Sequence, residues 1–266
     1  MKRAVIIIIL GSCWLAAAAF PAETPAERGK RVVYEALQAL GGDAFLHMTD
    51  RVESGRAYSF YREQISGLSI AKIYTRYLAP VPGVAAVSER EAFGLKEDSS
   101  VLLTPDGAWD VTYRGARPLD DQTYARYKET TLRNVLYILR QRLSEPGLAF
   151  YSQGTDLFEF HPVEIVDITD SRDITVTVYF DQRSKLPVHQ TSRRRNEQFK
   201  DFDTEVTNYG LYRDVGHGVK WPFNIRRERN GEKIFEMFSD DVQINKDLTD
   251  DLFTLAGNIK ILPKAK

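Results

Sequence analysis

The side chains of this sequence that are suited to catalysis or metal binding are four histidines and many carboxylates, and the histidines match no common catalytic or metal site. His47, His161, His189 and His217 are far apart, without the i, i+4 or short-loop pairing typical of zinc ligands. His217 lies between two glycines, which is typical of a turn. The sequence has no Gly-x-Ser-x-Gly elbow, no phosphate-binding glycine loop and no cysteine nucleophile. We therefore expect neither a metal site nor a cofactor.

The carboxylates occur mainly where turns and helix caps favour them. Asp120-Asp121, Asp240-Asp241 and Asp250-Asp251 fit such positions. Glu159 and Glu164 could act as general acid and base on a glycan, which would make the protein a hydrolase of an envelope polymer. We favour solvated strand faces for both residues, and we predict that the chain is not an enzyme.

The N-terminus has the features of an export signal. Met1-Lys2-Arg3 is basic, residues 4–20 are almost wholly apolar, and Ala17-Ala18-Ala19 offers a small-x-small cleavage site. We expect a cleaved signal peptide over residues 1–19 and a location in the periplasm of a Gram-negative-type bacterium. We favour cleavage over an uncleaved anchor helix or a lipid anchor at Cys13. Cys13 is the only cysteine, so the mature chain could form no disulfide.

The overall charge indicates little about a partner. The chain has 36 basic and 37 acidic side chains, which excludes the basic footprint of a nucleic-acid-binding domain. The one dense basic run is Arg193-Arg194-Arg195, which we interpret as a solvated strand edge that discourages edge-to-edge pairing. A contact with phosphate or an anionic lipid is the alternative interpretation.

The second half of the chain has the pattern of long β-hairpins. Residues 173–180 alternate between apolar and polar side chains, as in a strand with one buried face. Strands at 204–215 and 219–229 meet across Gly216-His217-Gly218, and Asn230-Gly231 opens a further hairpin. These elements predict a large antiparallel sheet.

The first half combines helices with shorter strands. Thr24-Pro25-Ala26-Glu27 has the form of a capping box, and apolar residues then recur at helical spacing up to Gly41-Gly42. A polar turn centred on 64–67 is expected between the first two strands. A long helix, capped by Asp120 or Asp121, is expected to continue to residue 143. The strands are predicted over 52–61, 68–77, 85–93, 101–104 and 108–112.

Several turn and strand motifs, taken in order, resemble the LolA/LolB-like superfamily of bacterial envelope proteins, which includes outer-membrane lipoprotein-sorting carriers. The resemblance covers about residues 28–255. It rests on Ala39-Leu40-Gly41-Gly42, Thr104-Pro105-Asp106-Gly107-Ala108-Trp109, Val178-Tyr179-Phe180-Asp181, Lys185-Leu186-Pro187-Val188, Tyr209-Gly210-Leu211-Tyr212-Arg213-Asp214-Val215, Gly218-Val219-Lys220-Trp221-Pro222-Phe223 and Asp251-Leu252-Phe253.

The resemblance implies an α+β, mainly β fold. It implies a strongly curved antiparallel sheet that forms a half-open barrel, with helices covering the concave face and a hydrophobic cavity that accommodates acyl chains. We expect one domain over residues 28–255, a short lead over 20–27 and a C-terminal tail over 256–266.

Large apolar side chains are the candidates for lining such a cavity. An acyl chain gains about 0.8 kcal/mol for each methylene removed from water, so a shielded apolar surface is sufficient. The same side chains could instead fill a core. The candidates are Phe60, Trp109, Trp221, Phe223 and Ile225 on strands, and Tyr124, Tyr127, Leu132, Val135, Leu136 and Leu139 on the long helix, which would act as a lid.

We therefore predict a monomeric periplasmic protein that binds a lipid or lipoprotein acyl chain, in outer-membrane lipoprotein sorting or in envelope sensing. Transient membrane contact would accompany this role, and nucleic acid would not be a partner. The alternative is an envelope interaction or regulatory module that recognises a protein through an edge strand or exposed hairpin, without a lipid cavity.

Overall fold

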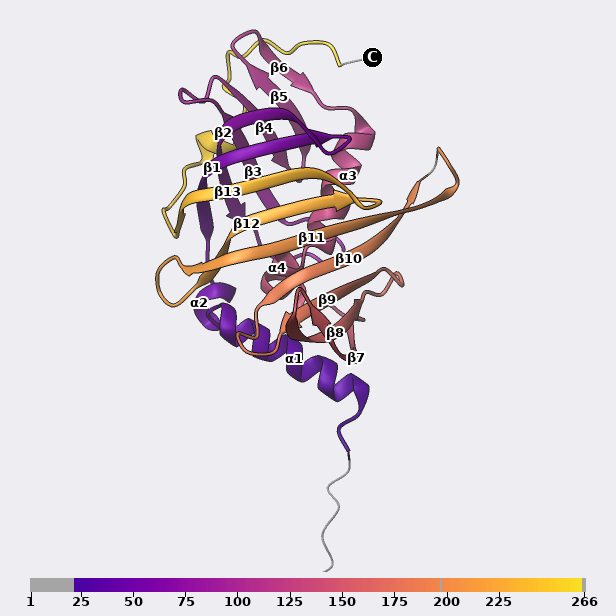
Figure 1. Cartoon of the computed structure of the whole chain (residues 1–266). Coiled ribbons are helices and arrows are strands. Elements are labelled where there is room, and N and C mark those ends of the chain that lie inside the picture. The colour runs from indigo at the N-terminus through magenta and orange to yellow at the C-terminus, as the bar shows by residue number, and fades with distance from the viewer. Residues whose placement is uncertain (1–21, 197, 265–266) are drawn as a thin grey trace, which may run out of the picture.

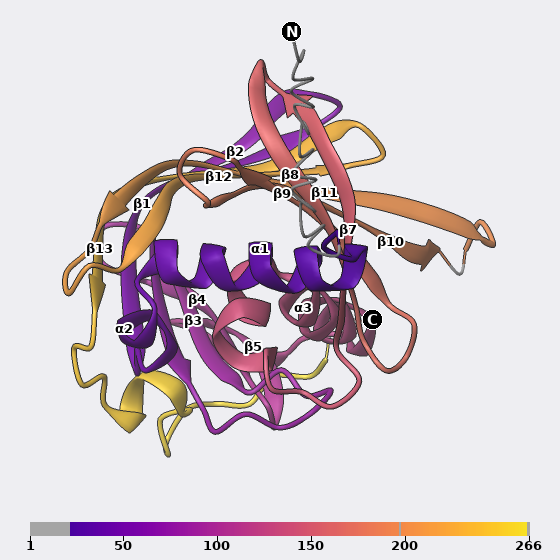
Figure 2. The same cartoon turned by 90° about the horizontal axis from the view of Figure 1, so that it is seen from below.

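A single curved sheet dominates the structure, a computed structural model that describes residues 22–196 and 198–264. Within these residues, thirteen antiparallel strands form the sheet in the order β6-β5-β4-β3-β2-β1-β13-β12-β11-β10-β9-β8-β7. The sheet curls around its helices without closing into a barrel (Figures 1 and 2). The predicted half-open barrel is thus confirmed. The predicted signal peptide over 1–19 lies outside the described residues.

The elements follow one another along the chain largely as hairpins. The helical segments are α1 (Pro25–Leu40), α2 (Asp43–Leu46), α3 (Asp121–Arg133), α4 (Val135–Tyr137), the π-helical turn η1 (Ile138–Arg142) and the 3-10 turn η2 (Asp250–Phe253). The strands are β1 (Asp50–Tyr61), β2 (Gln64–Tyr77), β3 (Val87–Phe93), β4 (Ser99–Thr104), β5 (Gly107–Thr112), β6 (Gly115–Pro118), β7 (Ala149–Phe158), β8 (His161–Thr169), β9 (Thr175–Asp181), β10 (Pro187–Asn196), β11 (Asp201–Asp214), β12 (Lys220–Arg229) and β13 (Glu232–Ile244).

The pairing of β1 with β13 joins two meanders into one sheet. Every other pair of neighbouring strands within the sheet is consecutive in the chain. The β1–β13 register shifts between Ser54 and Gly55, which marks a bulge. A Cβ atom at Gly55 would lie 2.1 Å from the carbonyl oxygen of Phe238, so only glycine fits there. Bulges of this kind bend a strand and increase its twist, which favours the curvature of this sheet.

The turn between β1 and β2 lies earlier than the sequence predicts. Arg62 and Glu63 have φ values of 48° and 62°, and β2 begins directly afterwards at Gln64. Two consecutive left-handed residues match a tight hairpin turn of type I′. The expected turn at 64–67 is therefore wrong, because two non-glycine residues adopt a conformation that usually requires Asn or Gly.

The predicted long helix is interrupted at Asn134. This residue is extended, with φ −70° and ψ 124°, so α3 ends at Arg133 and α4 begins at Val135. The Asn134 side chain accepts hydrogen bonds from the backbone N–H groups of Leu136 (2.9 Å) and Tyr137 (3.2 Å). Asparagine competes with helical hydrogen bonding in this way, which makes it a better cap than a mid-helix residue. The expectation of one continuous helix to residue 143 is wrong for that reason.

The apolar core occupies one half of the concave side. It is formed by α1, α4 and η1 packed on strands β8, β9, β11, β12 and β13, and Val33, Val135, Leu139 and Val178 are completely inaccessible to solvent. Helix α1 also lies close against β7, because a Cβ atom at Gly29 would be 2.9 Å from the backbone of residues 150–152. This half of the interior is therefore filled.

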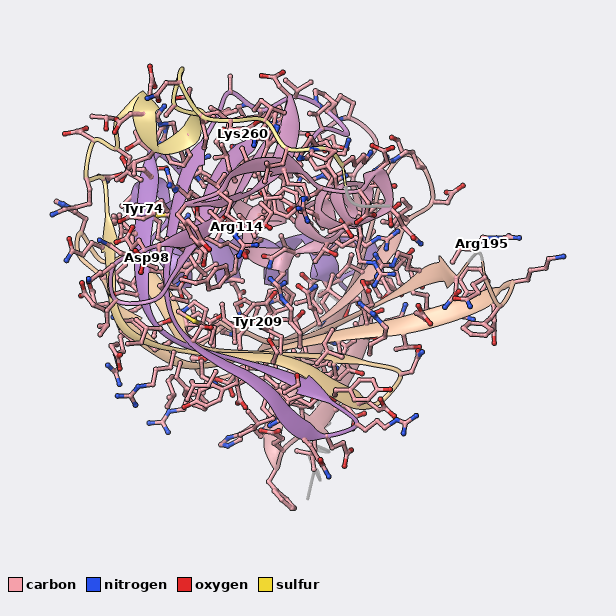
Figure 3. The ribbon with its side chains drawn as sticks, turned by 90° about the horizontal axis from the view of Figure 1, so that it is seen from above. Tyr74, Asp98, Arg114, Arg195, Tyr209 and Lys260 are labelled. Carbon is pink, nitrogen blue, oxygen red and sulfur yellow. The ribbon has the colours of Figure 1, made fainter. Side chains whose placement is uncertain are left out.

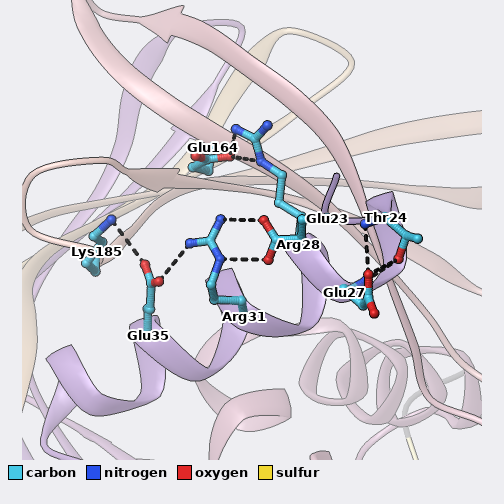
Figure 4. Close-up of polar contacts among 8 residues, drawn as sticks. All are labelled: Glu23, Thr24, Glu27, Arg28, Arg31, Glu35, Glu164 and Lys185. Atoms are coloured by element: carbon cyan, nitrogen blue, oxygen red, sulfur yellow. Dashed lines mark hydrogen bonds and ion pairs between the residues drawn. The ribbon is translucent and has the colours of Figure 1, made fainter. Parts of the chain in front are cut away.

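Polar contacts fasten α1 in place (Figure 4). Thr24 and Glu27 form the predicted capping box, with both reciprocal hydrogen bonds present. Arg28 pairs with Glu164 on β8 at 2.6 Å. Glu35 pairs at 3.1 Å with Lys185, in the turn between β9 and β10. These contacts tie the helix to two separate parts of the sheet.

The C-terminal segment covers one edge of the sheet. The Ala116 N–H donates to the Lys260 carbonyl at 2.9 Å, and the Leu262 N–H donates to the Ala116 carbonyl at 2.8 Å. Part of the predicted tail thus pairs with β6, which removes that strand edge as a free template for another chain.

The close packing of α1 on β7 predicts that Gly29→Ala destabilises the protein. Alanine normally favours a helix over glycine by about 1 kcal/mol. Here the added methyl group meets backbone atoms that cannot move aside, so the free energy of unfolding should fall by about 1–3 kcal/mol. Urea denaturation followed by circular dichroism measures the change. Lys30→Ala, at an exposed position of the same helix, is the control. Equal or greater stability of Gly29→Ala would contradict this packing.

Candidate functional site

The other half of the concave side contains an open groove of about 260 Å³. Its floor consists of small side chains, and the register places Ala57 opposite Ser69, Ser59 opposite Gly67, and Gly55 opposite Ala71. Side chains that face the inside of a curved sheet normally fill the space. Small residues at consecutive inward positions leave it empty. We call this hollow the concave groove.

Apolar residues border the concave groove and continue its floor. Ile73, Phe93 and Phe235 line the groove. Met237 on β13 lies opposite both Ala57 and Ile225, so the three residues share one face of the sheet. The predicted site residue Ile225 therefore lies on the same face as the groove floor.

One carboxylate lines the concave groove and a second lies beside it. Glu91 lines it, and Glu89 lies one strand period away, where it lines a cavity of about 80 Å³ beside α3. Burial and the neighbouring Glu89 raise the pKa of Glu91 to about 7, although Arg227 acts in the opposite direction. Burial also raises the pKa of Glu89, against the influence of Arg51. The charge of this region therefore depends on pH near neutrality.

A buried ion pair of Arg51 with Glu53 lies next to these carboxylates and is linked to Glu89 through Thr75. Both side chains are inaccessible to solvent apart from a few per cent of their surface. Arg51 donates to the Thr75 hydroxyl at 2.9 Å, and Thr75 donates to Glu89 at 3.1 Å. Glu53 also accepts hydrogen bonds from the Ser239 hydroxyl and from the indole N–H of Trp221, the latter at 3.3 Å. Removing one partner of such a pair strongly destabilises the folded protein, because the other charge remains buried.

Trp221 is consequently part of a polar network, and its ring also forms a wall of the small cavity. The Arg51 guanidinium lies over its ring, 4.2 Å from the centroid, which is a cation–π geometry. Trp221 also lines the small cavity together with the predicted residues Tyr127 and Leu136. The structure thus brings three of the predicted site residues to one place, beside the concave groove rather than within it.

Other predicted residues of the helix stripe lie in packed surroundings. Val135, Leu139 and Phe223 belong to the main core. Leu132 packs in a separate small cluster with Ala85, Val87 and Tyr137.

Tyr124 anchors α3 to the sheet, and its hydroxyl donates to the carbonyl groups of Thr104 (2.6 Å) and Pro105 (2.8 Å).

The structure does not bring Trp109 and Phe60 to this site. Trp109 lies opposite Leu102, which lies opposite Arg90, so its side chain is on the face opposite to that of Glu89 and Glu91. Phe60 lies near the end of β1, where the Lys233 ammonium is 4.8 Å from its ring centroid.

The sequence contains a signal for the concave groove that large apolar residues obscure. Gly55, Ala57 and Ser59 recur with a period of two, and Gly67, Ser69 and Ala71 do so on the next strand. Two paired strands with small residues at alternate positions indicate a face with unfilled space. The positions of large apolar side chains do not indicate this space.

His189 and Glu164, one member of the predicted acid–base pair, have structural partners. The His189 ring hydrogen-bonds Asn208 at 2.7 Å, and Glu164 is held by Arg28. Glu159 is two-thirds exposed at the turn before β8. Within residues 22–196 and 198–264, no three metal-ligating side chains converge, and no helix is long and apolar enough to cross a membrane.

Comparison with solved structures identifies the architecture. The chain aligns with a DUF1329 family protein from Desulfovibrio piger over 87% of its own length and 98% of that protein's, with a TM-score of 0.59 and 12% identity. A putative outer membrane lipoprotein-sorting protein domain from Vibrio parahaemolyticus gives a TM-score of 0.54 at 10% identity, over 86% and 97% of the two chains. The chain has the LolA/LolB-like fold.

A LolA superfamily protein from Nitrosomonas europaea shows the same likeness, with a TM-score of 0.50 and 11% identity over 85% of this chain and 97% of that one. No family model and no curated protein matches the sequence. At such identities a structural likeness shows the fold and leaves the role to be argued from the site.

The raised pKa of Glu91 predicts a pH-dependent stability that Glu91→Gln removes. A carboxyl group whose folded pKa (about 7) exceeds its unfolded value (4.5) holds its proton more tightly in the folded state. Its contribution to stability is present below about pH 4.5 and is lost as pH rises through 7. Between pH 5 and 8, the wild type should lose about 1 kcal/mol or more relative to the variant, since one pKa unit corresponds to about 1.4 kcal/mol.

Urea denaturation at a series of pH values measures this difference. Asp98→Asn, which removes an exposed carboxylate, should keep the wild-type slope. A Glu91→Gln variant with that same slope would show that Glu91 ionises normally in the folded protein.

Proposed function

We propose that this protein binds the acyl chain of a lipid or lipoprotein in the concave groove and carries it through the periplasm without catalysing a reaction. One observation supports this above the others. One half of the concave side is filled by the apolar core, whereas the other half leaves an open, largely apolar hollow of about 260 Å³. The fold is shared with a lipoprotein-sorting domain, which favours carriage over catalysis. Export by residues 1–19 is part of the proposal.

The size of the groove suggests how a chain would be accommodated. Ligand pockets usually measure about 300–1,000 Å³, so the groove as it stands holds only part of a long chain. The rest of the acyl chain would extend into the small cavity beside α3. Tyr127 and Thr131 of α3 form one wall of that cavity. Within the part of the chain that the structure describes, the Tyr127 hydroxyl is buried without a hydrogen-bond partner. A displacement of α3 would therefore break no hydrogen bond at that hydroxyl.

The carboxylates give the groove a dependence on pH. An apolar chain that covers Glu91 removes water from its carboxyl group, which costs much less for the protonated form than for the charged form. Binding should therefore be tightest when Glu91 is protonated. This couples release of the cargo to a rise in pH or to any change that ionises Glu91.

A second candidate function is the docking of an envelope protein on the convex face. Leu68, Ile70 and Phe238 are exposed there by 59%, 45% and 41%, and Tyr58 packs edge-on against Phe238. An exposed apolar cluster of this kind is typical of an interaction surface.

Filling the groove should abolish binding while leaving the fold intact. Ser69→Phe places a ring over the groove floor, so the dissociation constant for a fluorescent fatty acid should rise by about tenfold or more, which corresponds to ~1.4 kcal/mol. Ile70→Phe is the matched control, because the adjacent residue points to the convex face. Fluorescence titration gives the affinities, and circular dichroism confirms folding. Normal binding by folded Ser69→Phe would refute the groove, and loss in Ile70→Phe alone would favour the convex face.

The affinity for the same fatty acid should fall as pH rises from 6 to 8. The physical reason is the ionisation of Glu91 beneath the bound chain. Glu91→Gln should bind with an affinity that changes little over this range and exceeds the wild type at pH 8. A neutral long-chain alcohol serves as the second probe, because its own charge does not change. An identical pH profile for the two proteins would argue against contact between Glu91 and the chain.

A further inference from the structure

A second hollow, of about 250 Å³, lies between α3 and the strands β10 and β11. We call it the arginine pocket. Strands β10 and β11 project from the body of the molecule beside α3, and Arg195 lies on this projection (Figures 1 and 3). Among the described residues, four arginines and two carboxylates line the pocket, and these six side chains carry an excess of two positive charges. They are Arg126, Arg133, Arg194 and Arg195, with Glu129 and Asp203.

The helix and the strand contribute their arginines through regular geometry. Arg126, Glu129 and Arg133 are spaced so that they share one face of α3. On the strand side, Arg194 lies opposite Asp203. Arg133 and Arg194 are only 9% and 8% exposed, so two guanidinium groups are held inside the protein rather than in solvent. Buried arginines at a hollow are costly unless something satisfies their charge.

The carboxylates in the arginine pocket satisfy the guanidinium groups incompletely. Glu129 lies 3.6 Å from Arg133 and 4.0 Å from Arg194, which are long ion pairs. Asp203 accepts hydrogen bonds from the amides of Asn196 (3.1 Å) and Asn230 (2.9 Å).

Arg194 pairs with Glu205 outside the lining. The Nη1 group of Arg133 is buried without a hydrogen-bond partner within the described residues. An orphan buried donor of this kind calls for an acceptor.

The pKa directions agree with an excess of positive charge. Burial, together with the charges of Arg126 and Arg229, lowers the pKa of Arg194 to about 10. Burial and Arg126 also lower the pKa of Arg229. The negative charge of a bound anion would offset the repulsion among these guanidinium groups.

We propose that the arginine pocket binds a phosphate-type oxyanion, either the phosphate headgroup of a lipid or a free phosphate. A tetrahedral oxyanion offers several acceptors to guanidinium groups that converge from α3 and β10, and arginine matches phosphate in a bidentate geometry. A carboxylate ligand is less suited, because Glu129 and Asp203 already supply carboxylates and leave the donors unsatisfied. This inference goes beyond acyl-chain binding and does not depend on it.

Isothermal titration calorimetry at low salt tests the proposal with two probes, inorganic phosphate and dihexanoyl phosphatidic acid below its micelle concentration. Arg126→Gln removes a partly exposed guanidinium that carries little of the fold, and should weaken binding about fivefold or more. Glu129→Gln removes the competing carboxylate and should tighten binding. Lys128→Gln, whose side chain lies over the Tyr124 ring, is the control and should bind as the wild type does.

Each outcome bears on the proposal. Binding of inorganic phosphate with this order of variants supports a free anion as ligand. Binding of only the phosphatidic acid, with the same order, assigns the pocket to a lipid headgroup. Absence of binding to both probes, or equal affinities in all four proteins, would overturn the proposal. The Ser69→Phe variant separates the two sites, because it should leave phosphate binding unchanged even though the concave groove is blocked.

Discussion

The side chain of Gln190 holds the break between α3 and α4, and the division of the interior depends on it. Its carbonyl oxygen accepts hydrogen bonds from the Val135 N–H (2.8 Å) and the Tyr209 hydroxyl (2.7 Å), and its amide donates to the Arg133 carbonyl (3.2 Å). Backbone groups that an interrupted helix leaves unpaired are thereby satisfied inside the protein. Tyr209 faces this interior from β11 (Figure 3).

This anchoring gives the two halves of the concave side different properties. Helix α4 and η1 are held in the apolar core, which is filled. Helix α3 lies where the interior is polar and incompletely filled, with the small cavity beside Tyr127 and the arginine pocket along the face of Arg126. The buried Arg51–Glu53 ion pair lies on β1, where Arg51 also lines this small cavity. A single helix thus borders both candidate sites, and its position influences each.

The sequence predicts the sheet better than it predicts the site. Strict alternation and Asn230-Gly231 define hairpins because their causes are local, and the capping box at Thr24 is local for the same reason. The break at Asn134 is capped locally by the asparagine side chain and is also held by Gln190, 56 positions away in the chain, so periodicity alone extends the helix through it. Large apolar residues identify a core, whereas a groove is defined by the space that small residues such as Ala57 leave, and that space exists only once the sheet has curved.

Photo-crosslinking with a fatty acid that carries a diazirine near its chain end shows which face of the sheet holds the acyl chain, because adjacent residues on a strand face opposite sides of the sheet. Binding in the concave groove should give saturable crosslinks, mapped by mass spectrometry, to groove residues such as Ser69, Ile73 and Phe235. Crosslinks confined to Leu68, Ile70 and Phe238 on the convex face, or labelling that an excess of unlabelled fatty acid does not compete away, would contradict it.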